Sequence, residues 1–178
     1  MKLYARDRLT DRAGAYALLE RGAMEMWGLS SLPELVREPG GKPRFSDFPN
    51  LHFNLSHSGS FALCALGDSP VGVDIQIVKD TWREGLPRRV CSREELVWLE
   101  GQADRWGAFA LLWSLKEARA KYTGTGLRAG VREIAVPLPE GGKSLYERDG
   151  LFFRIFSGSG WRGAVCAAEA PPEDLIWI

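Results

Sequence analysis

The sequence is poor in cysteine, carries no excess of either charge and contains no long apolar run. Its 178 residues include 3 cysteines, and 23 basic side chains balance 23 acidic ones. The cysteines are odd in number, widely spaced and flanked by apolar or small residues, which indicates buried free thiols rather than a disulfide framework or a zinc site. Free thiols are typical of a reducing compartment, and we therefore expect a cytoplasmic protein.

The balanced charge and the short apolar runs also argue against several classes of partner. With a formal net charge of zero, the chain has no overall field that favours nucleic acid or an acidic membrane surface. The first residues, MKLYARDRLTDRAG, lack the apolar core of a signal peptide, and no stretch is long enough to span a membrane. We expect a protein that is neither exported nor embedded and that holds any anionic ligand with local side chains.

With 45% hydrophobic content, the chain can fill one core or two small fused halves. Apolar periodicity and capping residues predict the secondary structure. The expected elements are a helix between Asp11 and Gly28, an exposed turn at 40–44, a half-buried strand at 51–58, a hairpin formed by 61–66 and 71–78 around the turn 67–70, a helix opened by the capping box Ser92–Glu95, a long helix from about Asp104 to Tyr122 that stops at Gly124, two strands around the turn 157–160, and a short C-terminal strand.

Polar side chains interrupt three of these otherwise apolar segments. They are Ser56 and His57 in the strand at 51–58, Asp74 and Gln76 in the strand at 71–78, and Lys116, Glu117 and Lys121 in the long helix. Strand alternation places Asp74 and Gln76 on one face, and an aspartate in mid-strand is disfavoured unless something compensates it. Helical spacing places Glu117 and Lys121 in one row with Trp113, which we expect to be a packing residue.

Each of these features has an ordinary structural explanation. A Glu–Lys pair at i,i+4 is common on exposed helices and contributes only ~0.3–0.5 kcal/mol. Asp74 can cap a bulge, and a histidine such as His57 is more commonly a loop or core residue. Taken together, however, two carboxylates and a neutral oxygen suit a hard divalent cation, while lysines and a histidine suit phosphate groups. The conjunction indicates one site.

The segments GKP, FNLSHSG, VGVDI and WSLKEARAKYTGTGL, in this order and spacing, closely resemble the signature segments of 4'-phosphopantetheinyl transferases of the surfactin-synthetase-activating type. The resemblance covers roughly residues 40–168. It implies an α+β fold, a pseudo-dimer of two similar α/β halves with the active site in the cleft between them. We expect the halves at residues 1–70 and 71–178, joined as one compact unit. The implied reaction transfers 4'-phosphopantetheine from coenzyme A to a serine of an acyl or peptidyl carrier protein and releases 3',5'-ADP.

The resemblance also implies roles for individual residues. Asp74 and Glu117 would be Mg²⁺ ligands, with Glu117 also the base for the carrier serine and Lys121 the third catalytic residue. Gln76 stands where the family usually has glutamate, and we expect it to ligate Mg²⁺ directly or through water. His57 would contact the 3'-phosphate of coenzyme A, and the other residues expected to bind coenzyme A are Lys42, Pro43, Asn54, Ser56, Lys116 and Lys121. Further basic contacts are expected from Arg6, Arg8 or Arg12, and carrier specificity from the surface around residues 82–100; we expect a monomer.

Two other functions are consistent with parts of the pattern. A hydrolase could use Ser56 and His57, but adjacent strand residues point to opposite faces, and no G-x-S-x-G elbow surrounds the serine. A noncatalytic module that binds coenzyme A or a carrier protein could carry the same motifs, with Gln76 marking lost activity. The presence of Asp74, Glu117 and Lys121 argues against such a loss of activity.

Overall fold

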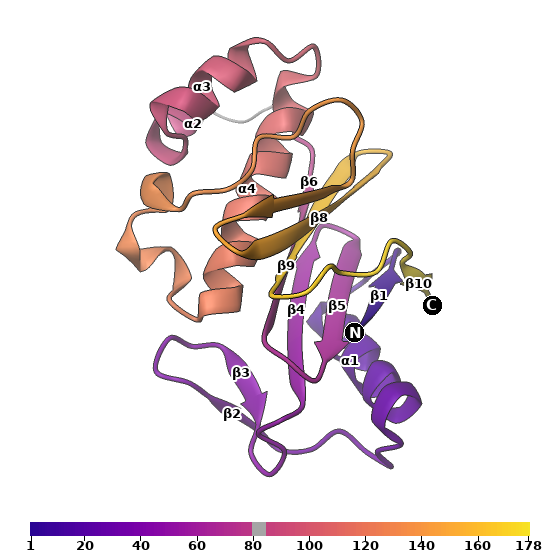
Figure 1. Cartoon of the computed structure of the whole chain (residues 1–178). Coiled ribbons are helices and arrows are strands. Elements are labelled where there is room, and N and C mark those ends of the chain that lie inside the picture. Colours follow the sequence, from indigo (N-terminus) through magenta and orange to yellow (C-terminus); the bar gives the residue numbers. More distant parts are fainter. Residues whose placement is uncertain (80–84) are drawn as a thin grey trace.

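Two four-stranded sheets, each covered by one long helix, form the framework of the residues that the structure describes (Figure 1). The structure is a computed structural model, and it describes residues 1–79 and 85–178, without the side chains of residues 12, 128 and 129. The elements are β1 (Lys2–Arg6), α1 (Arg12–Trp27), β2 (Leu35–Arg37), β3 (Pro43–Phe45), β4 (His52–Ser58), β5 (Phe61–Gly67), β6 (Val71–Ile77), α2 (Gly85–Val90), α3 (Arg93–Glu100), α4 (Arg105–Thr123), the 3-10 turns η1 (Gly126–Ala129) and η2 (Val131–Glu133), β7 (Leu145–Arg148), β8 (Leu151–Gly158), β9 (Trp161–Ala167) and β10 (Ile176–Trp177).

The first sheet has the strand order β10-β1-β5-β4, and the second has the order β6-β9-β8-β7. A short hairpin, β2–β3, stands apart from both. Helix α1 packs on the first sheet and α4 on the second, so each half is a sheet with its own helix. This arrangement confirms the expected α+β fold of two α/β halves.

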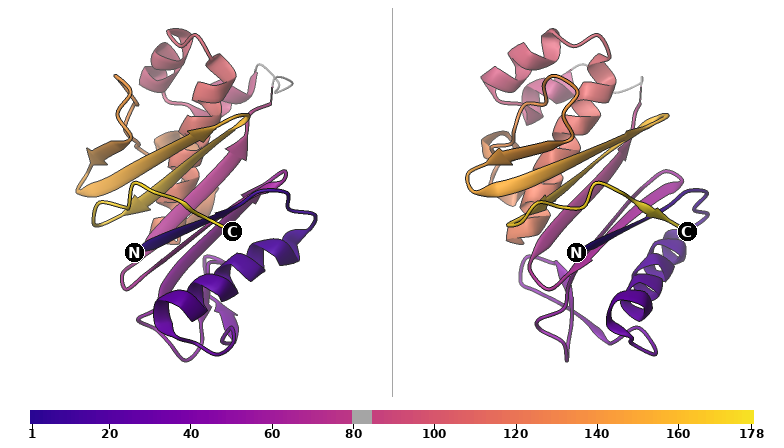
Figure 2. Two further views of the ribbon diagram at one scale, coloured as in Figure 1. Left: turned by 90° about the vertical axis from the view of Figure 1, so that its right-hand side faces the viewer. Right: turned by 45° about the vertical axis from the view of Figure 1, so that its right-hand side comes forward.

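The C-terminal strand returns to the first half. β10 pairs in parallel with β1, with Ile176 opposite Tyr4, and the yellow C-terminal segment lies beside the indigo N-terminal strand in both views of Figure 2. Residues 71–178 therefore contribute one strand to the sheet that is otherwise built from residues 1–70. The division of the chain at residue 70 stays a prediction.

The expected hairpin between β5 and β6 is wrong. β5 pairs antiparallel with β1 on one side and with β4 on the other, so both of its edges are occupied. β6 pairs instead with β9, which lies far away in the sequence. The turn at residues 67–70 consequently carries the chain from one sheet to the other rather than folding it back on itself.

The predicted helix ends are confirmed. They could be predicted because a capping residue acts on backbone groups only a few residues away in the sequence. The Asp11 carboxylate accepts a hydrogen bond from the Gly14 amide at the start of α1, and the Asp104 carboxylate accepts one from Gly107 at the start of α4. Gly124 ends α4 with a φ of 73°, a left-handed conformation that glycine adopts without strain.

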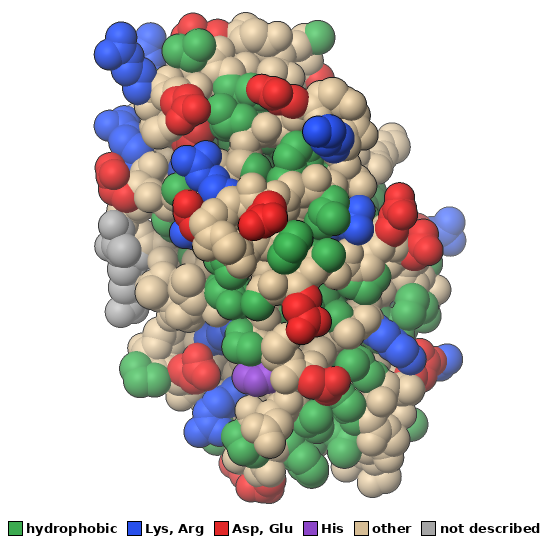
Figure 3. Space-filling model, viewed as in Figure 1, with side chains coloured by type: hydrophobic (Ala, Val, Ile, Leu, Met, Phe, Trp, Pro, Cys, Tyr) green, Lys and Arg blue, Asp and Glu red, His purple; other side chains and the backbone are tan. Residues whose placement is uncertain are grey.

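Apolar packing continues from one sheet to the other. One cluster joins Leu3 and Leu63 of the first sheet to Val73, Trp161 and Val165 of the second. Two further clusters lie beneath α1 and α4. The three cysteines are free and buried in these two helix-covered clusters, as predicted. Acidic and basic side chains are interspersed over the face in Figure 3, and among the described residues no helix has both the length and the apolar character needed to cross a membrane.

Candidate active site

The free edges of the two sheets meet at β4 and β6, and side chains join them where no strand ladder forms. Asn54, Ser56 and Ser58 alternate along β4 and therefore share one face. The Asn54 Oδ1 atom accepts a hydrogen bond of 2.8 Å from the Val73 amide, and the Ser58 hydroxyl accepts one of 3.1 Å from the Ile77 amide. This polar seam brings Ser56 opposite Asp74.

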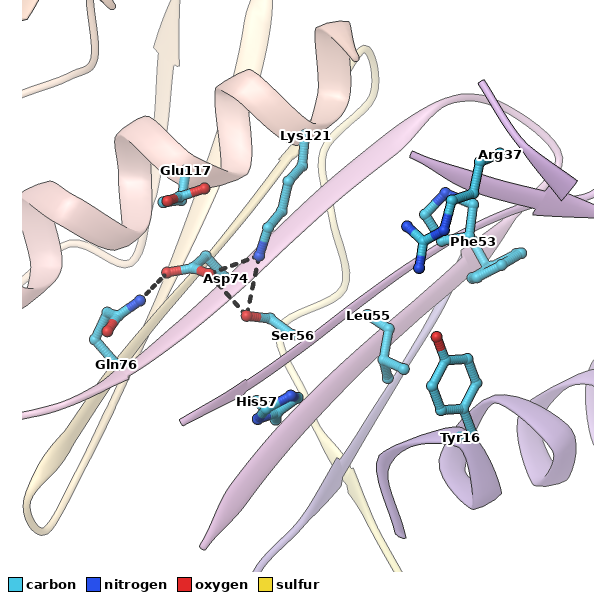
Figure 4. Close-up of a pocket in the computed structure, with 11 residues that line it drawn as sticks. Tyr16, Arg37, Phe53, Leu55, Ser56, His57, Asp74, Gln76, Glu117 and Lys121 are labelled. Carbon is cyan, nitrogen blue, oxygen red and sulfur yellow. Dashed lines mark hydrogen bonds and ion pairs between the residues drawn. The ribbon is translucent and has the colours of Figure 1, made fainter. Parts of the chain in front are cut away.

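Asp74 is the centre of the hydrogen-bond network at this junction (Figure 4). Its side chain is only 3% exposed. The Oδ1 atom accepts hydrogen bonds of 2.7 Å from both the Ser56 hydroxyl and the Lys121 ammonium group. The Oδ2 atom accepts one of 2.9 Å from the Gln76 amide. The aspartate that is unfavourable in mid-strand is thus compensated by an ammonium group and two neutral donors.

A glycine allows α4 to deliver its side chains to this strand. A Cβ atom on Gly72 would lie 2.0 Å from the Ala118 carbonyl oxygen and 2.4 Å from the Tyr122 nitrogen, which is impossibly close. The glycine of VGVDI therefore permits direct contact between the backbones of β6 and α4. As a result, Lys121 reaches Asp74 and also donates a hydrogen bond of 3.1 Å to the Val73 carbonyl.

Glu117 lies one turn before Lys121 on α4 and lines the same pocket. Among the described residues, its carboxylate has neither a hydrogen bond nor an ion pair. Burial, and secondly the charge of Asp74, raise the pKa of Glu117, while Lys121 opposes the shift. At this end of the pocket, two carboxylates thus face one ammonium group.

The pocket has a volume of about 340 Å³ and is lined by Tyr16, Arg37, Pro43, Phe53, Leu55, Ser56, His57, Asp74, Gln76, Glu117 and Lys121. It brings together seven residues that the sequence analysis selected, from Pro43 to Lys121. Four lining residues were not selected as site residues: Tyr16, Arg37, Phe53 and Leu55. In Figure 4, Arg37 and Tyr16 lie at the opposite end of the pocket from Glu117 and Gln76.

Arg37 could have been found from the β2–β3 hairpin. The sequence predicted an exposed turn at residues 40–44, without paired strands on both sides of it. In the structure, Arg37 pairs with Pro43 across the hairpin, directly beside the GKP motif. Recognising two short strands around Gly40 and Gly41 would have placed the guanidinium group in the pocket.

Three residues expected to bind coenzyme A do not line this pocket. Lys42 donates a hydrogen bond of 3.0 Å to the Val71 carbonyl and lines an adjoining cavity of about 240 Å³. Asn54 is only 3% exposed and its oxygen is used in the seam.

Lys116 is the third, and its ammonium group is fully buried on another side of α4, 2.8 Å from the Glu95 carboxylate. Because an α-helix turns by about 100° per residue, Lys116 and its neighbour Glu117 face different surroundings. Lys116 is therefore placed to bind Glu95 and not coenzyme A.

Of the remaining expected residues, those that the structure describes do not line the pocket. Arg6 and Arg8 do not line it, and the side chain of Arg12 lies outside the described residues. In the region expected to select the carrier protein, residues 82–84 also lie outside the described residues, while α2 and α3 occupy most of the remainder.

The oxygen donors of the pocket suit a hard cation. Within residues 1–79 and 85–178, no three histidine, cysteine, aspartate or glutamate side chains form a metal cluster. Asp74, Glu117 and the amide of Gln76 nevertheless supply oxygen ligands of the type that Mg²⁺ prefers, usually completed by water and substrate phosphates. Burial, and secondly the charge of Asp74, raise the pKa of Glu117, and a cation bound between the two carboxylates would oppose this shift.

Comparison with known proteins gives a consistent assignment. The model of the 4'-phosphopantetheinyl transferase superfamily matches residues 70–168. The chain is 32% identical over 146 residues to the 4'-phosphopantetheinyl transferase Sfp of Bacillus subtilis strain 168, covering 78% of this chain and 65% of that protein. It is 39% identical over 109 residues to the transferase psf-1 of Bacillus pumilus, covering 60% and 46% of the two chains. It is 41% identical over 101 residues to the transferase AcpT of Salmonella typhimurium, covering 54% and 52%. The match thus spans 65% of the length of Sfp and about half the length of psf-1 and AcpT.

Proposed function

The chain belongs to the 4'-phosphopantetheinyl transferase superfamily, and from this membership we propose that it transfers 4'-phosphopantetheine from coenzyme A to a carrier protein. The acceptor is a serine hydroxyl of an acyl or peptidyl carrier protein. The observation that carries the proposal is the convergence of Asp74, Glu117 and Lys121 in one pocket between the two halves. We further propose that the protein acts as a cytoplasmic monomer.

Glu117 is the proposed base. The serine oxygen attacks the β-phosphorus of coenzyme A, a new P–O bond forms, and the P–O bond to 3',5'-ADP breaks. The serine proton passes to the Glu117 carboxylate, which has no hydrogen bond or ion pair among the described residues to compete for it. Burial supports this role, because it raises the pKa of Glu117 and so increases its affinity for the proton.

Lys121 and Asp74 position and neutralise charge at the diphosphate. The Lys121 ammonium group is held by Asp74, Ser56 and the Val73 carbonyl, so its position is fixed before substrate binds. A fixed cation beside the reacting phosphorus stabilises the charge that develops on the leaving group. Asp74, Glu117 and Gln76 would hold Mg²⁺, which when bound supplies Lewis-acid neutralisation of the diphosphate.

We propose that coenzyme A extends across two neighbouring cavities. Pro43 and Phe53 line both the active-site pocket and the adjoining cavity that contains Lys42. We assign His57 to the 3'-phosphate, and Arg37, Pro43 and Ser56 to the walls that orient the nucleotide. Lys42 supplies a cation to the second cavity, although burial lowers its pKa.

A hydrolase based on Ser56 and His57 does not fit this geometry. The Ser56 hydroxyl donates to Asp74 and accepts from Lys121, so its hydrogen-bond partners come from the charged cluster. His57 lines the same pocket, but in the described part of the chain no hydrogen bond joins its imidazole to the Ser56 hydroxyl.

The test is intact-mass analysis of apo acyl and apo peptidyl carrier proteins incubated with the enzyme, coenzyme A and Mg²⁺. A gain of one phosphopantetheine group, together with release of 3',5'-ADP, supports the proposal. Reactions without coenzyme A and with the Glu117→Gln variant are the controls. Tight binding of coenzyme A with no mass gain on either carrier would instead identify a noncatalytic binding module.

A further inference from the structure

Side chains from three separate elements make hydrogen bonds to the outward edge of β6. Alternate residues of this edge strand direct their amide and carbonyl groups away from β9. Their partners are Lys42 on the Val71 carbonyl, Asn54 on the Val73 amide, Lys121 on the Val73 carbonyl and Ser58 on the Ile77 amide. The outward edge of β6 is therefore the border of its sheet and also part of the framework of the active site.

Val73 is held at both of its backbone polar groups. Its amide donates to Asn54 over 2.8 Å, and its carbonyl accepts from Lys121 over 3.1 Å. Val73 immediately precedes Asp74, so this clamp fixes the backbone from which the Asp74 carboxylate projects. Both Val73 and Asn54 are almost completely buried, at 1% and 3% exposed.

We propose that Asn54 is a positioning residue for Asp74 and that it does not bind coenzyme A. The proposal rests on the transferase function given above, because positioning matters only if Asp74 acts in the reaction. Asn54 is not among the residues that line the pocket, and its side-chain hydrogen bond goes to the Val73 amide rather than to Asp74.

The expected consequence of losing Asn54 follows from this placement. Without its acceptor, the Val73 amide is left buried and unpaired, and the edge strand relaxes toward other partners. A displacement of about 1 Å in a reacting group can lower the rate by roughly 100-fold. The loss should appear in kcat, because the groups that contact coenzyme A remain in place.

The test compares Asn54→Ala with the matched variant Ser58→Ala. Each substitution removes one seam hydrogen bond to a β6 amide, but Ile77 lies farther from Asp74 than Val73 does along the strand. We expect Asn54→Ala to lower kcat by roughly 10- to 100-fold. The calorimetric Kd for coenzyme A should change by less than about threefold. Ser58→Ala should retain nearly the full kcat.

Amide hydrogen exchange measures the clamp without reference to activity. In the unmodified protein the Val73 amide should be strongly protected although β6 is an edge strand, and Asn54→Ala should remove this protection while leaving that of Ile77. Rapid exchange of Val73 in the unmodified protein would overturn the proposal even if the variant does not fold. A raised Kd for coenzyme A with an unchanged kcat in Asn54→Ala would also overturn the proposal, because that is the behaviour of a ligand-binding residue. Unchanged values of both Kd and kcat in a folded Asn54→Ala protein would overturn it as well. If the unmodified protein transfers nothing, the proposed function fails, while the exchange measurement still decides whether the clamp exists.

Discussion

The Lys116 ammonium group lies 2.8 Å from the Glu95 carboxylate in the interior of the second half, with the two side chains 0% and 6% exposed. Hydrogen bonds to the Val131 and Ile134 carbonyls complete its environment. The other Glu95 oxygen accepts a hydrogen bond of 2.7 Å from the Ser92 amide and completes the capping box of α3. One carboxylate thus connects the start of α3 to the middle of α4.

Lys116→Met should destabilise the protein without affecting the binding site. Removing one partner of a buried ion pair leaves the other charge unpaired, at a cost of about 3–5 kcal/mol. We expect this loss in denaturant unfolding, with little change in the calorimetric Kd for coenzyme A. The double variant Lys116→Met/Glu95→Gln should regain part of the stability, because the glutamine oxygen can still cap Ser92. A weakened Kd in the folded single variant would return Lys116 to the ligand site.

Glu117→Gln should abolish transfer while the protein still binds coenzyme A. The substitution keeps the shape of the side chain but removes both the proposed base and a negatively charged oxygen ligand. Loss of a general base typically lowers the rate by roughly 10²–10⁴-fold. Single-turnover transfer to a carrier protein gives the rate, and calorimetry gives the affinity. A folded variant with near-normal turnover would remove Glu117 from the mechanism.

The same substitution should change how stability depends on pH. Since the pKa of Glu117 is raised in the folded state, the folded protein holds this proton more tightly than the unfolded chain does. Its stabilising contribution is present in full below the unfolded pKa, near 4.5, and is lost as pH rises through the higher folded pKa. In metal-free buffer, the stability of Glu117→Gln relative to the unmodified protein should therefore increase as the pH rises above the unfolded value of 4.5. Glu94→Gln, an exposed change on α3, is the control, and a difference that does not vary with pH would contradict the expectation.

His57→Ala should weaken coenzyme A more than 3'-dephospho-coenzyme A. The side chain is exposed and lines the pocket, where it is assigned to the 3'-phosphate. A hydrogen bond to a charged group contributes about 1.5–3 kcal/mol. Competition binding with the two ligands measures the difference directly. Equal losses for both would show that His57 supports the local structure instead.

Gln76→Glu should lower the Mg²⁺ concentration needed for half-maximal transfer. Gln76 now donates its amide to Asp74 over 2.9 Å, and a carboxylate is a stronger ligand for a hard cation than a neutral amide oxygen. Without metal, the new charge faces Asp74 and Glu117, so the variant should be less stable than the unmodified protein and regain stability when Mg²⁺ is added. Gln76→Ala separates loss of the hydrogen bond from gain of the charge. An unchanged or raised metal requirement in a folded Gln76→Glu protein would exclude residue 76 from the metal site.

Local signals made much of the architecture predictable. Asp11, Asp104 and Gly124 act on their own helices, and their effects were visible within four residues of sequence. Alternation in β4 and β6 likewise predicted which polar residues share a face. The β5–β6 hairpin was wrong because pairing depends on competition from other strands: β1 and β4 occupy both edges of β5, and β6 pairs with the distant β9.

The sequence predicted which residues belong to the candidate site better than it predicted the contacts that those residues make. Periodicity placed Glu117 and Lys121 in one row, and the pocket contains both. Periodicity could not show that Lys116 pairs with Glu95 or that Asn54 accepts a hydrogen bond from the Val73 amide. Each of these contacts depends on a segment that tertiary packing brings near.

The buried cysteines provide the molecule with internal reporters of opening. Burial raises the pKa of Cys91 and Cys166 to about 12 and also raises that of Cys64, and only the thiolate is the reactive form. An alkylating reagent therefore meets no reactive sulfur until the surrounding core separates. Cys64 lies under α1, whereas Cys91 and Cys166 lie in the cluster under α4. The order in which these sulfurs become labelled would reveal which half of the protein loosens first, without the introduction of any foreign probe.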